Sequence, residues 1–426
     1  MRRYRLVVYF AFLYLQIHAK TIIYDDHIYE PEVQTIIFYL DKGEITNILN
    51  PPIAHLQQSY PLVLEFDHHS QSVSNFYYKV VHCNADWTPS VLMDSEYLKE
   101  FINDYLITQY QISFNTRAKY VHYKLTVPAV KISGNYLLMV YQNNNTEDVI
   151  LTRRFVIFEN RISINPDFRI SQGIDERMTH QQIDFTISYK SYNEIFNLST
   201  ELQVVIRQNY RWDNAIYNLP PLYVKDNDKI LDYHYFNLEN NFPGGNEFRM
   251  FDTRRIRNNA INIEKIDFLP TGINVYIMQE KSRNYKAYSQ MFDMNGRFVP
   301  YNNEAGGNFT DPDYTNVIFN LKTSEMPYGN IYVIGLFNNW RIDEKYMLKY
   351  DNETDSYKCS LFLKQGVYDY IYAVKSPKTP KSDEIALEGS HFQTENIYDI
   401  IVYHRPIGAR SDFVIGYIMQ KFNPQY

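Results

Sequence analysis

Short stretches in which apolar and polar residues alternate recur along most of the chain, and turns with Pro and Asn separate them. Such alternation predicts β-strands with one buried face, because successive side chains of a strand point to opposite sides. Helical periodicity is rare, and one stretch with it follows Ser95, a candidate N-cap for a short helix over 96–103. In the first part of the chain the pattern predicts strands over 35–39, 62–67, 76–82, 110–114, 121–127, 134–141 and 151–158.

The strand pattern continues beyond residue 160 and predicts a second all-β region. Its expected strands cover 183–189, 200–208, 231–236, 247–251, 262–268 and 273–278. The spacing of short strands with turns between them is typical of immunoglobulin-like or fibronectin-like sandwiches. No repeat with a period of about 20 to 50 residues is present, which disfavours a propeller or solenoid. We therefore predict an all-β fold of tandem β-sandwich domains, with a signal peptide at 1–19, an N-terminal sandwich at 20–160, a middle domain at 161–312 and a C-terminal domain with a tail at 313–426.

A sharply punctuated segment, 244–252, lies between two predicted strands. Its paired glycines tolerate positive φ or a close backbone approach, and the residues from Asn246 onward alternate as in a half-buried strand. Isolated charges are costly to bury, so the charged residues here are expected to be solvated or paired. Three interpretations stay open: an ion-pair cluster at a sheet edge, a partner-docking patch and a catalytic cluster. The residues concerned are Glu247, Arg249, Asp252, Arg254 and Arg255.

Length and composition support a folded, multi-domain protein. A chain of 426 residues exceeds one ordinary core and indicates two to four domains. Aromatic residues make up 16% of the chain, led by 40 Tyr and 26 Phe, and these residue types favour strands. The net charge of -7 provides no basic field for nucleic acid, so nucleic acid is not an expected partner.

The N-terminus has the pattern of an export signal. Arg2, Arg3 and Arg5 precede an apolar core over 6–17, and Ala19 is a small residue suited to cleavage. No cysteine of a lipoprotein anchor follows, and no later apolar run reaches the roughly 20 residues of a spanning helix. We expect a periplasmic protein that does not insert into the membrane directly.

The residues that commonly carry chemistry form no recognisable site. Cys83 and Cys359 are expected in separate domains as free thiols, and His82 and Cys83 would point to opposite faces of a strand. Nucleophile elbows and phosphate-binding glycine loops are absent from the sequence. Carboxylate pairs of a glycoside hydrolase can lie far apart in a chain, so a secreted hydrolase stays as a minor alternative. We predict a non-enzymatic protein with no catalytic, metal or cofactor-binding residues.

One motif near the C-terminus indicates a particular domain type. Residues 332–340 (YVIGLFNNW) and 361–370 (LFLKQGVYDY) resemble the early-set, glycogen-binding-like immunoglobulin domain, with Gln365 in place of the usual proline. This resemblance implies a sandwich fold, and carbohydrate binding is an alternative function. In that domain type the motif's Phe337 and Trp340 usually pack at the end of the sandwich, whereas sugar platforms need exposed aromatic rings.

Several motifs together resemble the plug protein family of the type IX secretion system. They are 78–87 (YKVVHCNADW), 245–249 (GNEFR), 335–340 (GLFNNW), 395–398 (ENIY) and 402–405 (VYHR), and the similarity extends over the whole expected mature chain. The resemblance implies a periplasmic, non-enzymatic protein that docks on a large outer-membrane β-barrel translocon. It also implies that the protein closes the periplasmic opening of the barrel while no substrate is in transit.

Contacts with such a partner are expected on loops at the ends of the sandwiches. Loop tips are free of ladder hydrogen bonds, and Tyr, Trp and Arg dominate the energetics of protein interfaces. Ordinary solvated turns are the alternative interpretation of the same residues. The candidate partner-binding residues are Tyr210, Arg211, Trp212, Arg254 and Arg255.

Overall fold

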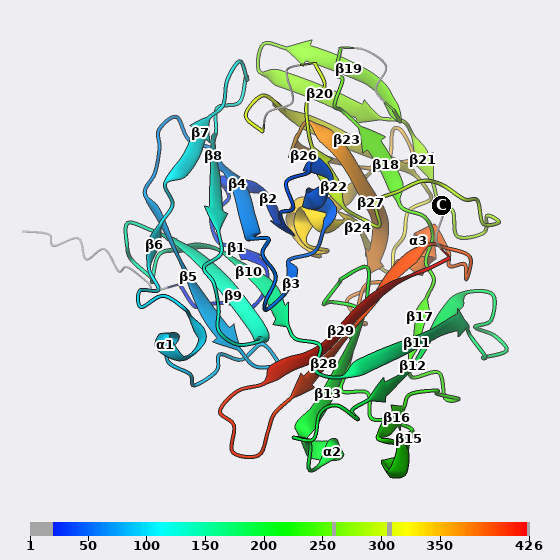
Figure 1. The fold of residues 1–426 in the computed structure, drawn as a ribbon. Coiled ribbons are helices and arrows are strands. Elements are labelled where there is room, and N and C mark those ends of the chain that lie inside the picture. Colours follow the sequence, from blue (N-terminus) through cyan, green and yellow to red (C-terminus); the bar gives the residue numbers. More distant parts are fainter. Residues whose placement is uncertain (1–19, 258–260, 305–308, 424–426) are drawn as a thin grey trace, which may run out of the picture.

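The computed structural model describes residues 20–257, 261–304 and 309–423, and within these ranges the chain forms five β-sheets. The expected signal peptide, 1–19, lies outside the described residues. None of the helices in the described part of the chain has the length and apolarity needed to span a bilayer. The all-β fold class predicted from the alternating pattern is confirmed. The sheets fall into three groups, the first, second and third units, which meet around the centre of the molecule (Figure 1).

The first unit is a sandwich of two sheets that enclose one apolar core. The sheet β1-β10-β9-β5-β6, with β3 beside β10, faces the sheet β2-β4-β8-β7. Phe66 and Tyr123 from one sheet and Val80 and Leu138 from the other are fully buried between them. The strands are β1 (His27–Ile28), β2 (Val33–Leu40), β3 (Ile53–His55), β4 (Leu62–His68), β5 (Phe76–Cys83), β6 (Tyr105–Leu106), β7 (Gln109–Ile112), β8 (Val121–Thr126), β9 (Gly134–Gln142) and β10 (Val149–Phe158).

The second unit combines a middle stretch of the chain with its C-terminal strands. One sheet has the order β11-β12-β16-β15, with β17 beside β12, and the other has the order β14-β13-β28-β29. The strands are β11 (Ser163–Ile170), β12 (His180–Ser188), β13 (Leu202–Gln208), β14 (Ile216–Tyr217), β15 (Tyr223–Lys225), β16 (Ile230–Asp232), β17 (Asn241–Pro243), β28 (Asn396–His404) and β29 (Phe413–Phe422).

The third unit is a ten-stranded sheet whose main path is β18-β27-β24-β25-β26-β23-β20-β19. The remaining strands, β21 and β22, pair with β23 and β27. Its strands are β18 (Arg249–Asp252), β19 (Ile263–Leu269), β20 (Gly272–Ile277), β21 (Glu280–Lys281), β22 (Phe298–Pro300), β23 (Tyr314–Lys322), β24 (Asn330–Ile334), β25 (Met347–Asp351), β26 (Ser356–Lys364) and β27 (Gly366–Lys375).

Helices are few and short in the described ranges. The expected helix over 96–103 is wrong in extent: α1 ends at Tyr97, Met93 occupies the N-cap position, and Leu98 is already extended. Leu98 and Tyr97 are buried in the sandwich core, so packing against the sheets overrides the local helical pattern. The helices are α1 (Asp94–Tyr97), α2 (Leu198–Glu201), α3 (Ile385–Glu388) and the 3₁₀ turns η1 (Ile45–Leu49), η2 (Asp226–Asp228), η3 (Leu336–Asn338) and η4 (Glu344–Tyr346).

Strand pairing crosses the boundary expected at 312–313. Strand β18 pairs with β27, and β28 pairs with β13 of the second unit along its full length. Sheet membership therefore does not follow chain order, whereas the change of sheet near residue 160 coincides with the expected boundary. The division into domains at these positions stays a prediction.

The three units share apolar clusters at their contacts. On β9 successive side chains face opposite ways, so that Leu138 enters the core of the first unit and Leu137 packs against the second unit. Ile37 and Tyr39 of the first unit belong to the same buried cluster as Phe319 of the third. The two free cysteines lie in different sheets, with Cys83 buried and Cys359 half-buried.

The segment 244–252 passes from the second unit to the third. A side chain at Gly244 would collide with the backbone carbonyl of His391, and Gly245 has a φ of 66°. Arg249 is buried and donates to Glu388 (2.9 Å) and to Glu280 (3.0 Å), both from other segments. The ion-pair interpretation of this segment thus fits its geometry, although most partners lie outside the five residues considered.

A buried polar network connects the first unit to the third. Lys364 Nζ lies 2.7 Å from Asp67 Oδ2, and both side chains are fully buried. Tyr314 donates to the same carboxylate oxygen at 2.6 Å, and His122 Nδ1 lies 2.8 Å from Asp67 Oδ1. The other imidazole nitrogen of His122 lies 3.0 Å from Glu65. Every oxygen of Asp67 therefore has a partner, as a buried carboxylate requires.

Replacing Lys364 with Met should lower the free energy of unfolding by about 3–5 kcal/mol, because Asp67 would then be a buried charge without its cation. Chemical denaturation of the purified protein measures this difference. Lys349→Met on the neighbouring strand β25 is the matched control, since Lys349 is exposed and its loss should change stability by about 0.5 kcal/mol or less. Equal losses in the two variants would contradict the role of the pair.

The same network predicts an acid-sensitive stability. Burial by itself raises the pKa of Glu65, but hydrogen bonds and charge attraction from His122 and Lys124 outweigh it and lower the pKa from 4.5 to about 2. The ionised form therefore stabilises the folded state above pH 4.5, and this contribution is lost as the pH falls towards 2. Unfolding measured between pH 5 and pH 2 should show a shallower loss of stability in Glu65→Gln than in the natural protein. Parallel pH profiles would show that Glu65 is not the responsible group.

Candidate functional site

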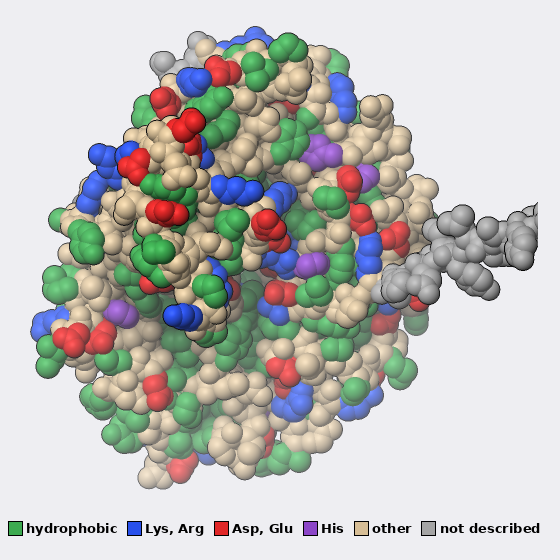
Figure 2. Space-filling model, turned by 180° about the vertical axis from the view of Figure 1, so that it is seen from behind, with side chains coloured by type: hydrophobic (Ala, Val, Ile, Leu, Met, Phe, Trp, Pro, Cys, Tyr) green, Lys and Arg blue, Asp and Glu red, His purple; other side chains and the backbone are tan. Residues whose placement is uncertain are grey.

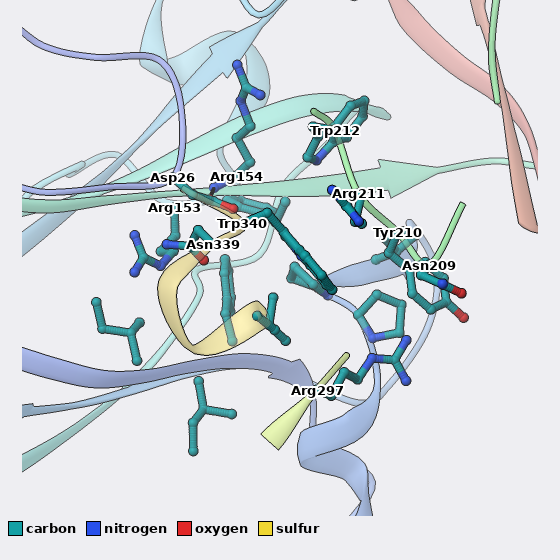
Figure 3. Close-up of a pocket in the computed structure, with 18 of the residues that line it drawn as sticks. Asp26, Arg153, Arg154, Asn209, Tyr210, Arg211, Trp212, Arg297, Asn339 and Trp340 are labelled. Carbon is teal, nitrogen blue, oxygen red and sulfur yellow. Dashed lines mark hydrogen bonds between the residues drawn. The ribbon is translucent and has the colours of Figure 1, made fainter. Parts of the chain in front are cut away.

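The described residues enclose a cavity of about 320 Å³ where the three units meet. The first unit contributes Asp25, Asp26 and parts of β2, β3 and β10, and the second contributes the loop 209–213 after β13. The third contributes residues around 295–298 and the turn 336–341 after β24. Figure 3 shows residues from these three sources facing one another across the cavity. The site therefore exists only in the assembled molecule.

All three tryptophans of the chain gather at this cavity. Trp212 and Trp340 line it, and Trp87 packs edge-on against Trp212 with 5.0 Å between the ring centroids. Arg211 lies over the indole of Trp340, 3.9 Å from the ring centroid, and this pair is visible in the middle of Figure 3. Arg207 lies 4.1 Å from the centroid of the Trp212 ring. Cation–π contacts thus fix both indoles that line the cavity.

Arginine is the commonest charged residue of the lining, with six arginines against three aspartates. Three of the arginines have carboxylate partners. Arg154 pairs with Asp25 at 3.1 Å, Arg207 with Asp399 at 2.5 Å, and Arg211 with both Asp213 and Glu384. The six arginines are Arg153, Arg154, Arg207, Arg211, Arg297 and Arg341, and the aspartates are Asp25, Asp26 and Asp213.

In the described part of the chain no carboxylate lies within ion-pair distance of the other three arginines. Arg153, with 5% of its surface exposed, donates to the backbone carbonyls of Thr152 and His27. Arg341 contacts His27 Nδ1 at 2.7 Å and the carbonyl of Asp26. One buried nitrogen of Arg297 has no hydrogen-bond partner, and its guanidinium lies over the ring of Tyr210. The lining therefore carries a surplus of positive charge.

The pKa values at the cavity follow from burial and from this surplus. Burial lowers the pKa of Arg153 to about 10, and the nearby Asp26 only partly offsets this effect while Arg341 adds to it. Burial also raises the pKa of Asp26, against the attraction of Arg153. For His27, burial and the charge of Arg341 both lower the pKa. The guanidinium of Arg153 is thus poorly hydrated, a state that an anion would relieve.

The structure brings three of the five candidate partner-binding residues together. Tyr210, Arg211 and Trp212 lie on one loop that begins with Asn209 and Tyr210 at φ of 53° and 60°. Arg211 has 5% of its surface exposed, so its guanidinium is part of the packing between units. Whether this loop also contacts a partner stays a prediction.

The other two candidates lie away from the cavity, on the turn after β18. Arg254 is half-buried and makes a bidentate pair with Asp252, and Arg255 is exposed. Sequence reasoning missed the arginines that converge here from other segments, Arg153, Arg297 and Arg341. The double arginine at 153–154 could have indicated this site, because two adjacent residues of a predicted strand point to opposite faces of the sheet and one arginine must therefore face inward.

The C-terminal motif forms a tight turn after β24. Asn338 accepts from the backbone N–H of Gly335 and donates to the carbonyl of Val333, which closes the turn after β24. Trp340 is buried against Phe248, with 5.7 Å between ring centroids. Its indole is therefore held in the packing of the sheet end, as the motif predicts.

Metal-ligating side chains do not gather at this site. Within the ranges that the structure describes, no three His, Cys, Asp or Glu residues are placed to hold a metal ion.

Fold and site together define a multi-unit all-β protein whose most elaborate feature is an arginine- and tryptophan-lined junction. The family model for the first domain of the type 9 secretion system plug protein matches residues 33–159. A solved structure, the crystal structure of a hypothetical protein from Parabacteroides merdae ATCC 43184 at 2.30 Å resolution, is similar over 94% of this chain and 100% of that chain, with 30% identity and a TM-score of 0.88. No curated protein matches the chain. The chain belongs to the type IX secretion system plug protein family, which indicates a role related to type IX secretion.

Replacing Arg211 with Ala should lower the free energy of unfolding by about 1.5–3 kcal/mol, because its charged hydrogen bonds to Asp213 and Glu384 would be lost. Thermal or chemical unfolding measures the change. Arg255→Ala, at an exposed arginine, is the control and should alter stability by about 0.5 kcal/mol or less. An unchanged stability of Arg211→Ala would mean that the junction does not depend on this residue.

Proposed function

We propose that the protein is the periplasmic plug of the type IX secretion translocon, which docks on the outer-membrane barrel and closes its periplasmic opening when no substrate is in transit. Family membership is the observation that carries this proposal. A plug must resist deformation, and the buried Lys364–Asp67 pair and the shared apolar clusters support a body whose units keep fixed positions. The role needs shape and contact, not chemistry.

The surface of the molecule supports docking through particular loops and not through a general electrostatic field. Figure 2 shows one face on which basic, acidic and apolar side chains are interspersed. A concentration of exposed apolar side chains occurs on the loop 91–102 of the first unit, around α1. Contiguous apolar side chains on a surface mark interaction sites. The four residues and their exposed fractions are Val91 (70%), Met93 (66%), Phe101 (99%) and Ile102 (67%).

We infer that this loop, called the apolar loop below, supplies contacts to the barrel in addition to Arg254 and Arg255. Phe101 and Ile102 have no packing role that would explain their type, because most of their surface is in water. Aromatic and aliphatic anchors that enter a partner's pocket give most of an interface's binding energy.

Copurification with the translocon tests both the function and the surface. The natural protein should be recovered with a large outer-membrane β-barrel when membranes are solubilised and the plug is captured. Phe101→Ser combined with Ile102→Ser should reduce the recovered barrel about ten-fold or more, with the melting temperature unchanged because both residues are exposed.

Ile174→Ser is the matched control, since Ile174 has 95% of its surface exposed but lies between β11 and β12 of the second unit. Full recovery of the barrel with the double variant would exclude the apolar loop. Failure of the natural protein to recover any barrel would contradict the plug function itself.

A further inference from the structure

The cavity between the units has the features of a ligand site that the plug function does not use. Its volume of about 320 Å³ is at the lower end of small-molecule sites, which typically span roughly 300–1,000 Å³. Such sites combine apolar walls with a few converging polar groups, often buried and with shifted pKa values.

One side of the cavity is cationic. Arg153 is almost fully buried, has no carboxylate within ion-pair distance among the described residues, and lies near Arg341. One guanidinium nitrogen of Arg297, elsewhere in the lining, is also buried without a hydrogen-bond partner. A buried guanidinium that has no carboxylate within ion-pair distance favours a bound anion, with which it forms strong charge-assisted hydrogen bonds.

Apolar side chains from β2, β3 and β10 of the first unit and from β22 of the third also line the cavity, and together they are called its apolar wall. An inorganic anion would make no use of such a wall, and the three aspartates in the lining oppose a doubly charged phosphate. The wall consists of Ile36, Phe38, Ile53, Phe155, Val156 and Phe298.

We propose that this cavity binds a small amphipathic carboxylate, with the carboxylate at Arg153 and Arg341 and the apolar body against the wall from β2, β3, β10 and β22. A medium-chain fatty acid and the apolar C-terminal end of a peptide share this chemistry. The site does not rest on the proposed function, because it is defined by the junction of the three units alone.

Titration of the full-length mature protein with octanoate tests the site, and intrinsic fluorescence is a direct readout because all three tryptophans lie at the cavity. Octanoate should give a saturable change and raise the melting temperature. 1-Octanol, which lacks the charge, and acetate, which lacks the body, should each bind at least ten-fold more weakly. A trileucine peptide with a free carboxyl terminus, measured beside its amide, distinguishes a peptide ligand from a fatty acid. If peptides are the natural ligand, the peptide acid should bind more tightly than octanoate, and the peptide amide should not.

Arg341→Gln should weaken octanoate binding at least ten-fold. The matched control is Arg161→Gln, which removes an arginine that pairs with Glu159 outside the cavity lining. Thermal unfolding of each unliganded variant shows whether it folds. Ile36→Phe is a second test, because it narrows the cavity at a half-buried wall position without removing a charge. Ile36→Phe should also weaken binding.

Three results would overturn the proposal. They are equal binding of octanoate and 1-octanol, octanoate binding that is unchanged in folded Arg341→Gln and in Ile36→Phe, and no response to octanoate or to the peptide acid.

Discussion

The pair of Lys364 and Asp67 is the interaction on which the arrangement of the units most depends. Lys364 ends strand β26 of the third unit and Asp67 lies in β4 of the first, so the ion pair crosses the contact between two separate sheets. Desolvation lowers the pKa of Lys364, and the same burial would raise that of Asp67 if Lys364 and His122 did not outweigh it. Two charges in such a place are tolerated only when each is the partner of the other. The pair therefore fixes the position of one unit relative to the other more specifically than apolar packing does.

Other buried charged pairs lie beside the contacts between units. Arg207 and Asp399 form a buried pair between adjacent strands of the second unit, and Arg207 also lies over Trp212 at the junction. Arg211 reaches from the second unit to Glu384, which precedes α3. Separating the first unit from the third would leave Lys364 and Asp67 without each other as partners, which is costly for buried charges. Fixed positions of the units are a property that the proposed plug role requires.

Local patterns predicted the strands well, and they did so for a definable reason. Where one face of a strand is buried, apolar and polar residues alternate visibly in the sequence. In β5, for example, Phe76, Tyr78 and Val80 are buried and the residues between them are half-exposed. Alternation says nothing about which strands pair, so the return of β28 to the second unit was not predictable from periodicity. The candidate residues Tyr210, Arg211 and Trp212 were chosen by residue type on a predicted loop, and the burial of Arg211 depends on Glu384 and Trp340, more than 100 positions away. The helix predicted after Ser95 is wrong in extent because burying Leu98 in the core stabilises the extended conformation more than the local helix propensity stabilises a helix.

The cavity illustrates a general consequence of joining units through charged residues. Carboxylates match three of the six lining arginines: Arg154 pairs within the first unit, Arg207 pairs within the second, and Arg211 pairs with Glu384, which precedes α3. The three arginines that have no such partner among the described residues also line the cavity. If the role of the buried Arg153 were only structural, replacing it with an apolar residue of similar size would be neutral or stabilising, since buried charges seldom add net stability. A desolvated guanidinium beside an apolar wall has a physical reason when an anion enters the space, and it has none when the space is only a packing defect.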